Sequence, residues 1–284
     1  MNAIIMAAGT SSRFVPLSYE KPKGLLEVKG EILIERQIRQ LLEAGVLDII
    51  VVVGYMAEKF TYLKDKYGVR IVVNEDYYRY NNTSSIIRVV DELEDTYLCS
   101  SDNYFPDNVF IGNPSSSYYS SLYEEGETEE YCLTTDHEDN IIQVKVGGAG
   151  SWYMVGHVFF KNDFSVKFRE IMKKEYVHDD TRQCYWEDVY IRNIQELPPL
   201  KIHRYRPHEI KEFDTLDELR EFDHSYIADT RSAVIKQICT AYNWKESELH
   251  GFQKALTNGH AFYFHVGDDR FLYDSVADKR IKKV

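Results

Sequence analysis

Residues 3–12 read AIIMAAGTSS, an apolar run that ends in small and polar residues. Such a run is typical of a buried strand followed by a polar loop. A second apolar run, DIIVVV at residues 48–53, is continuous and β-branched, which indicates a strand that is covered on both faces. Shorter runs at 70–74 and 96–101 predict two more strands of the same sheet.

Predicted helices separate these strands. Ile34, Ile38 and Leu41 recur at helical spacing and predict a helix over 33–44. Further helices are expected at 57–67 and 84–94. Strands that alternate with helices in this way favour a parallel sheet with right-handed crossovers. We therefore expect an α/β fold, a Rossmann-like, mostly parallel mixed sheet flanked by helices, with ligands bound beyond the carboxyl ends of its strands.

The pattern is less regular beyond residue 117. The elements expected there are strands at 130–135, 141–146, 152–160 and 209–214, and helices at 163–174 and 215–223. Thr215 and Glu218 form a capping-box pattern at the start of the last of these helices. We place a boundary near residue 226. This gives a domain over 1–226 and a small α+β appendage over 227–284, made of a helix at about 229–242 and a hairpin.

Composition excludes several classes of protein. The 284 residues carry a formal net charge of -12, which disfavours a nucleic-acid-binding surface. The N-terminus lacks a signal-peptide pattern, and no apolar run approaches the roughly 18 residues of a membrane span. The four cysteines form no CxxC pair, so neither a zinc site nor a disulfide framework is expected. These features predict a cytoplasmic protein.

The strongest chemical signal is MAAGTSSRFVPLSYEKPKGLL at residues 6–26. Small residues after a strand allow backbone N–H groups to approach phosphate oxygens closely. Arg13 can bind a phosphate with two N–H groups, and Lys23 supplies a compact positive charge. No GK[ST] follows Gly9, so the loop is not a Walker A motif.

This segment resembles the signature of the nucleotidyltransferases that activate sugar phosphates and alcohol phosphates, roughly AAGxGSRxxPLTxxxPK. The matching residues are Ala7, Ala8, Gly9, Ser12, Arg13, Pro16, Leu17, Pro22 and Lys23. Ser11 departs from the pattern, because that position is usually a second glycine. The resemblance implies the nucleotide-diphospho-sugar transferase type of fold. It also implies a nucleotide site formed by Ala7, Ala8, Gly9, Ser12, Arg13 and Lys23.

Two aspartates are the candidate metal ligands. Asp102 follows the predicted strand 96–101, where a carboxylate can hold Mg²⁺ against phosphate oxygens, although an isolated aspartate is more often a turn residue. Asp214 lies in EFDTLDEL, which resembles the (D/E)IDTxEDL pattern of the same superfamily and so implies the second ligand. Lys23, Arg13 and Asp102 are the expected catalytic residues, and Mg²⁺ is the expected cofactor.

Two more segments could contact substrates. Asn82 and Ser85 lie in YNNTSS, where they could cap a helix or read the edge of a cytosine. Aromatic rings beside carboxylates suit an ammonium group, and they suit core packing equally well. The candidate acceptor-binding residues are Tyr131, Tyr185, Trp186, Asp188 and Glu212.

Residues 1–225 resemble the bacterial CTP:phosphocholine cytidylyltransferases more narrowly. The resemblance is carried by the loop and by KYGVRIVVNEDYYRYNN, SSDNYF, CYWEDV and IKEFDTLDELREF. It implies transfer of CMP from CTP to phosphocholine, a small amino-alcohol phosphate. At Tyr131 the family member compared has tryptophan, so phosphoethanolamine and 2-aminoethylphosphonate stay open as acceptors. A sugar-1-phosphate nucleotidyltransferase and a nucleotide-binding module without turnover are the remaining alternatives.

The appendage has a weaker resemblance. Residues 235–273 resemble the start of choline-kinase-like phosphotransferases, with LTNG at 256–259 near the position of their nucleotide loop. No kinase catalytic loop follows, so kinase activity is not expected. A remnant, a packing element and a homodimer surface remain alternative interpretations of this segment.

Overall fold

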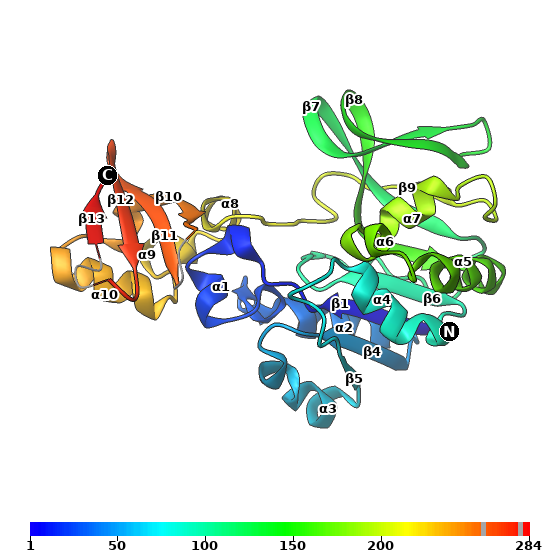
Figure 1. Cartoon of the computed structure of the whole chain (residues 1–284), viewed down its shortest axis with the longest axis horizontal. Coiled ribbons are helices and arrows are strands. Elements are labelled where there is room, and N and C mark those ends of the chain that lie inside the picture. The colour runs from blue at the N-terminus through cyan, green and yellow to red at the C-terminus, as the bar shows by residue number, and fades with distance from the viewer. Residues whose placement is uncertain (257–259, 278–280) are drawn as a thin grey trace. The chain divides into compact units, whose positions relative to one another are not determined.

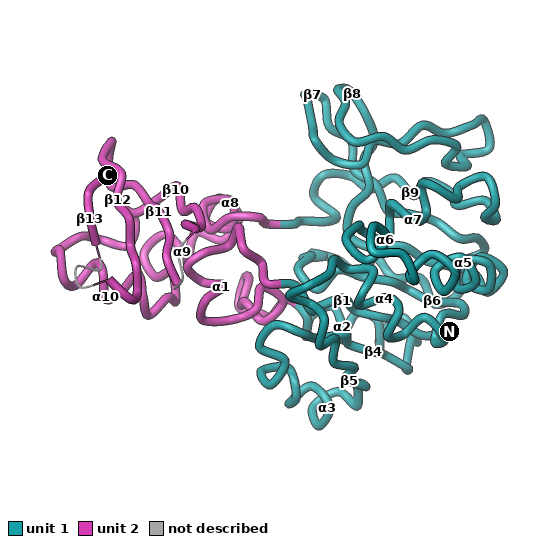
Figure 2. Tube along the Cα trace, viewed as in Figure 1, with its two compact units in different colours: residues 1–9, 34–212 teal, residues 10–33, 213–284 magenta. Residues whose placement is uncertain are grey.

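The computed structural model describes residues 1–256, 260–277 and 281–284. The chain forms two compact units (Figure 2). Unit 1 contains residues 1–9 and 34–212, and unit 2 contains residues 10–33 and 213–284. These units differ from the predicted domains 1–226 and 227–284, because the signature segment packs with the C-terminal residues. The functional boundary near residue 226 stays a prediction.

Unit 1 is built on a mixed sheet (Figure 1). Within the described residues its seven strands follow the order β5 (Arg70–Val73), β4 (Asp48–Val53), β1 (Asn2–Ala7), β6 (Thr96–Ser100), β8 (Ile141–Phe160), β7 (Tyr118–Thr135) and β9 (Lys201–Arg204). The first four strands are parallel to one another, whereas β8 is antiparallel to both β6 and β7. This arrangement confirms the predicted fold class. The three strands expected between 130 and 160 are parts of the two long strands β7 and β8.

Helices cover this sheet. Those of unit 1 are α2 (Leu33–Glu43), which starts at the junction with unit 2, α3 (Tyr62–Tyr67), α4 (Thr83–Val89), α5 (Asn162–Glu175), α6 (Asp179–Gln183) and α7 (Trp186–Arg192), with 3₁₀ turns η3 (Ala57–Phe60) and η4 (Val90–Glu92). Apolar residues of α4, α5 and α7 share one buried cluster with the sheet residues Ile4, Leu98 and Val158. In that cluster Phe160 stacks on Phe164 with ring centroids 4.5 Å apart. Burial of each such side chain contributes roughly 1.5–3 kcal/mol, so this shared core fixes α4 and α7 on the sheet.

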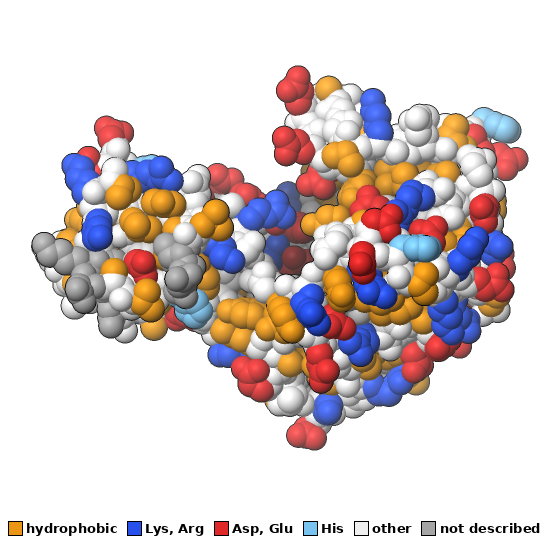
Figure 3. Space-filling view, viewed as in Figure 1, with side chains coloured by type: hydrophobic (Ala, Val, Ile, Leu, Met, Phe, Trp, Pro, Cys, Tyr) orange, Lys and Arg blue, Asp and Glu red, His pale blue; other side chains and the backbone are white. Residues whose placement is uncertain are grey.

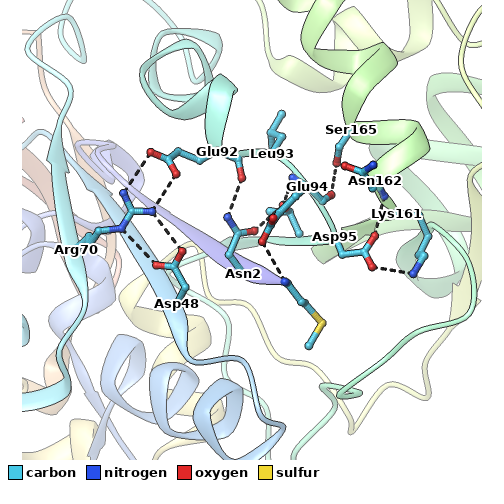
Figure 4. Close-up of polar contacts among 12 residues, drawn as sticks. Asn2, Asp48, Arg70, Glu92, Leu93, Glu94, Asp95, Lys161, Asn162 and Ser165 are labelled. Atoms are coloured by element: carbon cyan, nitrogen blue, oxygen red, sulfur yellow. Dashed lines mark hydrogen bonds and ion pairs between the residues drawn. The ribbon is translucent and has the colours of Figure 1, made fainter.

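Polar contacts tie together the amino ends of the parallel strands (Figure 4). Arg70 forms ion pairs with Asp48 at 3.3 Å and with Glu92 at 3.0 Å. Asn2 donates to the backbone carbonyl of Glu92 at 2.7 Å, and Lys161 pairs with Asp95 at 2.8 Å. These structural contacts lie at the end of the sheet opposite to the carboxyl ends of β1, β4 and β6.

The C-terminal part of unit 2 is an antiparallel sheet in the order β10 (Leu249–Lys254), β11 (Ala261–Val266), β12 (Asp269–Asp274) and β13 (Ile281–Lys283). Pairing of β11 with β12 confirms the predicted hairpin. The helices of this part are α8 (Leu216–Phe222), α9 (Ser225–Ala228) and α10 (Ala233–Tyr242), with a 3₁₀ turn η5 (Glu246–Glu248). Thr215 caps α8 by accepting from the Glu218 N–H at 3.2 Å, as predicted.

The signature segment supplies the rest of unit 2. Its elements are η1 (Ser12–Phe14), α1 (Leu17–Glu20), η2 (Lys23–Leu25), β2 (Glu27–Val28) and β3 (Glu31–Ile32). The strand predicted at 209–214 is wrong, because only Lys211 pairs, in an isolated bridge with Tyr104 of unit 1. Thr257, Asn258 and Gly259 of the proposed kinase-like loop lie outside the described residues.

No helix in the described part of the chain combines the length and the apolarity that crossing a membrane requires. On the face that Figure 3 shows, acidic and basic side chains are interspersed over the surface of unit 1.

Candidate active site

The carboxyl ends of three parallel strands meet at one edge of the unit 1 sheet. The Ala8 carbonyl accepts from the Tyr55 N–H at 3.1 Å, just beyond β4, and the Met6 carbonyl accepts from the Ser101 N–H at 3.1 Å, just beyond β6. Gly9 follows directly, and a Cβ atom built on it meets no described atom within 4 Å. Packing of the described protein atoms therefore does not require glycine at this position. Close approach of a phosphate to the backbone N–H groups would require it.

The cations of the signature lie beside Asp214 within unit 2. Arg13 Nη2 is 3.0 Å and Lys23 Nζ is 3.5 Å from Asp214 Oδ1. The Arg13 side chain is 72% exposed, whereas that of Lys23 is only 6% exposed. Burial of an ammonium group strengthens its interaction with an anion, since less water screens the charge. The two cations and this carboxylate, predicted from separate motifs, thus form one cluster.

Ser11 shows why the signature usually has glycine at this position. Its backbone is left-handed, with φ 49° and ψ 48°, and it precedes the turn η1, which begins at Ser12. Side chains with a Cβ atom adopt this conformation at a cost of roughly 1–2 kcal/mol, which glycine avoids. The loop of this chain therefore keeps the required backbone conformation despite the substitution.

Asp102 lies in the turn after β6, in unit 1, and its side chain is partly exposed. The next residue, Asn103, donates to Glu212 Oε2 at 3.3 Å. Tyr104 and Lys211 exchange two backbone hydrogen bonds of 2.8 and 2.9 Å, which hold Glu212 beside the Asp102 turn. Among the described residues, no group of three or more His, Cys, Asp or Glu side chains could by itself hold a metal ion. The pairing of Asp102 with Asp214 of unit 2 stays a prediction.

The two residues predicted to read the base are engaged with protein. Asn74, which is buried, donates to the hydroxyls of Ser84 and Ser85 at 2.8 and 2.9 Å. Asn82 Oδ1 accepts from the Trp186 N–H at 2.7 Å, and its Nδ2 donates to Glu187 Oε2 at 3.4 Å. Asn82 therefore links α4 to the start of α7, and base reading by Asn82 and Ser85 stays a prediction.

Aromatic residues around α7 divide into core and surface. Trp186 is 4% exposed and lies in the hydrophobic core, stacked on Tyr119 with ring centroids 5.8 Å apart. Tyr185, by contrast, is 49% exposed. The contacts of Trp186 are those of a packing residue, and its predicted contact with the acceptor has no support from this placement.

Asp188 connects two other candidate acceptor-binding residues, Tyr185 and Tyr131. Its Oδ2 accepts from the Tyr185 N–H at 2.8 Å, which caps α7, and its Oδ1 accepts from the Tyr131 hydroxyl at 3.0 Å. Burial and the nearby Asp188 carboxylate raise the pKa of Tyr131, so its hydroxyl stays protonated and keeps donating. The predicted residues Tyr131, Tyr185 and Asp188 are thus adjacent.

Glu187 lies within the quoted motif CYWEDV, but the sequence analysis did not assign it to the acceptor site. Its Oε1 accepts from the Tyr119 hydroxyl at 3.2 Å, in addition to the contact with Asn82. The residue keeps partial exposure, yet the dense protein around its carboxyl raises the pKa to about 7. A carboxyl that titrates near neutral pH is a common mark of a functional site. Its position in the first turn of α7, beside Asp188, was the available sequence signal.

Comparisons with known proteins identify the family. Residues 3–111 match the MobA-like NTP transferase domain. The chain is 38% identical over 235 residues to the 2-aminoethylphosphonate cytidylyltransferase of Lancefieldella rimae, covering 81% of this chain and 95% of that protein. It is 34% identical over 223 residues to the choline-phosphate cytidylyltransferase of Streptococcus pneumoniae, covering 78% and 97%. The chain belongs to this cytidylyltransferase family.

A solved structure supports the same family assignment. The CTP:phosphocholine cytidylyltransferase from Streptococcus pneumoniae is 35% identical, covers 79% of this chain and 98% of its own, and superposes with a TM-score of 0.76. As a cytidylyltransferase family member, the chain is a nucleotidyltransferase. The resemblance predicted from residues 1–225 is therefore confirmed.

Proposed function

We propose that this cytidylyltransferase family member transfers CMP from CTP to phosphocholine and forms CDP-choline and pyrophosphate. The names of its relatives support cytidylyl transfer and a small ammonium-bearing acceptor. The nucleic-acid and membrane partners that the sequence disfavours are not part of this proposal. Four free cysteines, Cys99, Cys132, Cys184 and Cys239, support a reducing cytoplasmic setting.

The observation that carries the proposal is a group of acidic and tyrosine side chains in unit 1. Glu187 accepts from the Tyr119 hydroxyl and Asp188 from the Tyr131 hydroxyl. Burial raises the pKa of the Tyr119 hydroxyl well above its usual range, and the charges of Glu187 and Glu212 raise it further. Carboxylates with aromatic rings complement an ammonium group. This chemistry favours an amino-alcohol phosphate over a sugar phosphate, because carboxylates attract a positively charged ammonium group more strongly than neutral sugar hydroxyls.

The proposed reaction is an in-line displacement. An oxygen of the acceptor phosphate forms a bond to the α-phosphorus of CTP, and the bond to the β-phosphate oxygen breaks, so that pyrophosphate leaves. No general base is needed, because a phosphomonoester has a second pKa near ~6 and is ionised at neutral pH. The chain's own residues then act by positioning and charge. Arg13 and the loop at Gly9 hold the triphosphate, and Lys23 stabilises charge on the α-phosphate.

The expected Mg²⁺ fits the chemistry of the two candidate ligands. Asp102 and Asp214 offer the carboxylate oxygens that this ion prefers, and phosphate oxygens and water would complete its coordination. When bound, the ion would neutralise charge on the phosphates. Arg13 and Lys23 beside Asp214 would then help to orient that carboxylate.

The same site favours a second candidate acceptor, 2-aminoethylphosphonate. A primary ammonium donates hydrogen bonds, which trimethylammonium does not, and Glu187, Asp188 and Glu212 offer several acceptor oxygens. Tyr131 is also a weaker cation–π partner than the tryptophan of the family member compared. The relative from Lancefieldella rimae carries the name of this activity. Phosphoethanolamine belongs to the same chemical class.

The test is pyrophosphate release from CTP and Mg²⁺ with phosphocholine, phosphoethanolamine or 2-aminoethylphosphonate. A kcat/KM at least tenfold higher for phosphocholine supports the proposal. A preference for a primary amine keeps cytidylyl transfer and replaces the acceptor. If CTP binds without pyrophosphate release from any acceptor, the chain is a nucleotide-binding module and the proposal fails.

A further inference from the structure

We infer that the C-terminal part of unit 2 positions the nucleotide-binding signature, with Glu20 as the main positioning residue. This inference rests on the proposed function, since it treats residues 10–26 as the CTP-binding loop. The motifs that carry the family resemblance end by residue 225, so the resemblance assigns no role to the segment that follows. This segment and the signature segment both belong to unit 2 (Figure 2), and the contacts between them indicate a role for it.

Glu20, the last residue of α1, caps helix α10. Its Oε1 accepts from the Ser232 hydroxyl at 2.5 Å and from the Val234 N–H at 3.2 Å, and its Oε2 accepts from the Ala233 N–H at 2.8 Å. Ser232 itself accepts from the Ile235 N–H at 3.1 Å. The first N–H groups of a helix lack partners within the helix, and a carboxylate there also interacts favourably with the helix dipole. Glu20 thus supplies hydrogen-bond acceptors to the first N–H groups of α10. The same bonds hold the end of α1 against α10.

Tyr19 fixes the same turn to the sheet. Its hydroxyl donates to the Ala261 carbonyl of β11 at 2.8 Å. Its ring stacks on His260 with centroids 4.4 Å apart and planes inclined by 5°. Two consecutive residues of the signature, Tyr19 and Glu20, therefore hold α1 against two different elements of the C-terminal segment. Lys23 follows three residues after Glu20, so a shift of α1 would also move its ammonium group.

The segment that carries Asp214 is held by the same sheet. Asp217 of α8 accepts from the Gly251 N–H of β10 at 2.7 Å. Arg220 of α8 is buried and donates to the carbonyls of Leu249 at 2.6 Å and Glu246 at 2.8 Å. At the start of this helix, the Asp214 N–H donates to Glu218 Oε2 at 2.9 Å.

The C-terminal sheet and α10 therefore anchor two segments that are far apart in sequence and whose charged groups meet. One segment carries Arg13 and Lys23, and the other carries Asp214, at 3.0 and 3.5 Å. Correct placement of phosphate-binding groups determines both affinity and rate, because a small displacement weakens every charge-assisted hydrogen bond. The C-terminal segment thus preorganises the proposed triphosphate site.

The test compares the full-length chain with Glu20→Gln and Glu20→Ala. Glutamine keeps one acceptor oxygen and alanine keeps none, so the KM for CTP should rise about threefold and about tenfold or more, respectively. The KM for the acceptor should change less than twofold. If a variant only reduced the amount of folded protein, the apparent kcat would fall, and the KM values for CTP and for the acceptor would both stay unchanged. Glu221→Gln, an exposed residue of α8 in the same unit, is the matched control and should equal the wild type.

A KM for CTP within twofold of the wild type in both Glu20 variants overturns the inference, and so does an equal rise of both KM values. Hydrogen exchange supplies a readout independent of turnover. In Glu20→Gln without nucleotide, the peptide containing residues 21–26 should exchange at least threefold faster, whereas unchanged exchange overturns the inference. If the wild type releases no pyrophosphate, the proposed function fails, and this exchange result alone decides whether the C-terminal segment holds the signature.

Discussion

The guanidinium of Arg13 lies 3.0 Å from the carboxylate of Asp214, although the two residues are far apart in the sequence. The ammonium of Lys23 reaches the same carboxylate oxygen at 3.5 Å. The Arg13 side chain is 72% exposed, and so exposed an ion pair contributes little to stability, typically about 0–1 kcal/mol. We propose that this cluster binds and orients a charged ligand.

Removal of Lys23 should affect catalysis more than folding. We expect Lys23→Ala to lower kcat by on the order of 10²–10³, as found for the loss of one electrostatic stabiliser of a transition state. Asp102→Ala should have a similar effect if that carboxylate holds the metal. Turnover is measured by pyrophosphate release at saturating CTP, with circular dichroism as the folding control. Near wild-type rates in either variant would refute the corresponding role.

The Gly9→Ala variant tests whether glycine is needed at this position for phosphate binding or for protein packing. Because an added Cβ meets no described atom within 4 Å, the midpoint of thermal unfolding should stay within about 2 °C of the wild type, since unstrained surface changes are usually worth less than ~0.5 kcal/mol. The KM for CTP should rise about tenfold or more, as the methyl group displaces a phosphate from backbone N–H groups. Calorimetry and steady-state kinetics measure the two effects. A large loss of stability with an unchanged KM would show that packing requires Gly9.

Ser11→Gly restores the usual residue of the signature. Glycine relieves the left-handed strain at φ 49° but costs backbone entropy, so the net gain should lie between about 0 and 1 kcal/mol. Thermal unfolding should show a midpoint equal to or a few degrees above that of the wild type. A clearly lower unfolding midpoint would mean that the Ser11 hydroxyl stabilises the folded chain by more than the left-handed backbone conformation costs.

Glu187 predicts a pH dependence of stability. Its pKa of about 7 in the folded chain exceeds the ordinary value of 4.5, so between these values the folded state holds a proton that the unfolded state has released. Stability from this group is therefore present below pH about 4.5 and is lost as the pH rises towards about 7. We expect Glu187→Gln to gain thermal stability over the wild type as the pH is raised from 5 to 8. A stability difference that is constant across this range would contradict the shifted pKa.

The same residue predicts a pH dependence of acceptor binding. Above pH about 7 Glu187 is ionised and attracts the ammonium of the acceptor, so the KM for the acceptor should fall several-fold between pH 6 and 8. The acceptor phosphate also titrates in this range, with a second pKa near ~6. Glu187→Gln is the control, because only the phosphate contribution should remain in it. Identical pH profiles in the two proteins would exclude a role for Glu187 in binding the head group.

The sequence alone predicted the fold class. Continuous apolar runs such as 48–53 indicate strands covered on both faces, and the helices between them favour a parallel sheet. A long motif ties residue type to position, so the sequence also identified Gly9, Arg13 and Lys23 as candidate phosphate-binding residues, and that role stays a prediction. The strand predicted at 209–214 was wrong, because local patterning does not show whether a partner strand is available, and only Lys211 finds one.

Tertiary structure decided the environment of each side chain. It placed Trp186 in the core, bonded Asn82 to the first N–H of α7 and put Glu187 where protein surroundings raise its pKa, since burial and hydrogen-bond partners depend on residues distant in sequence. It also showed that Glu20 and Tyr19 bind the C-terminal segment, although the signature pattern specifies no residue at these two positions. A sequence motif indicates which residues contact a ligand. The tertiary structure determines which other parts of the chain hold those residues in position.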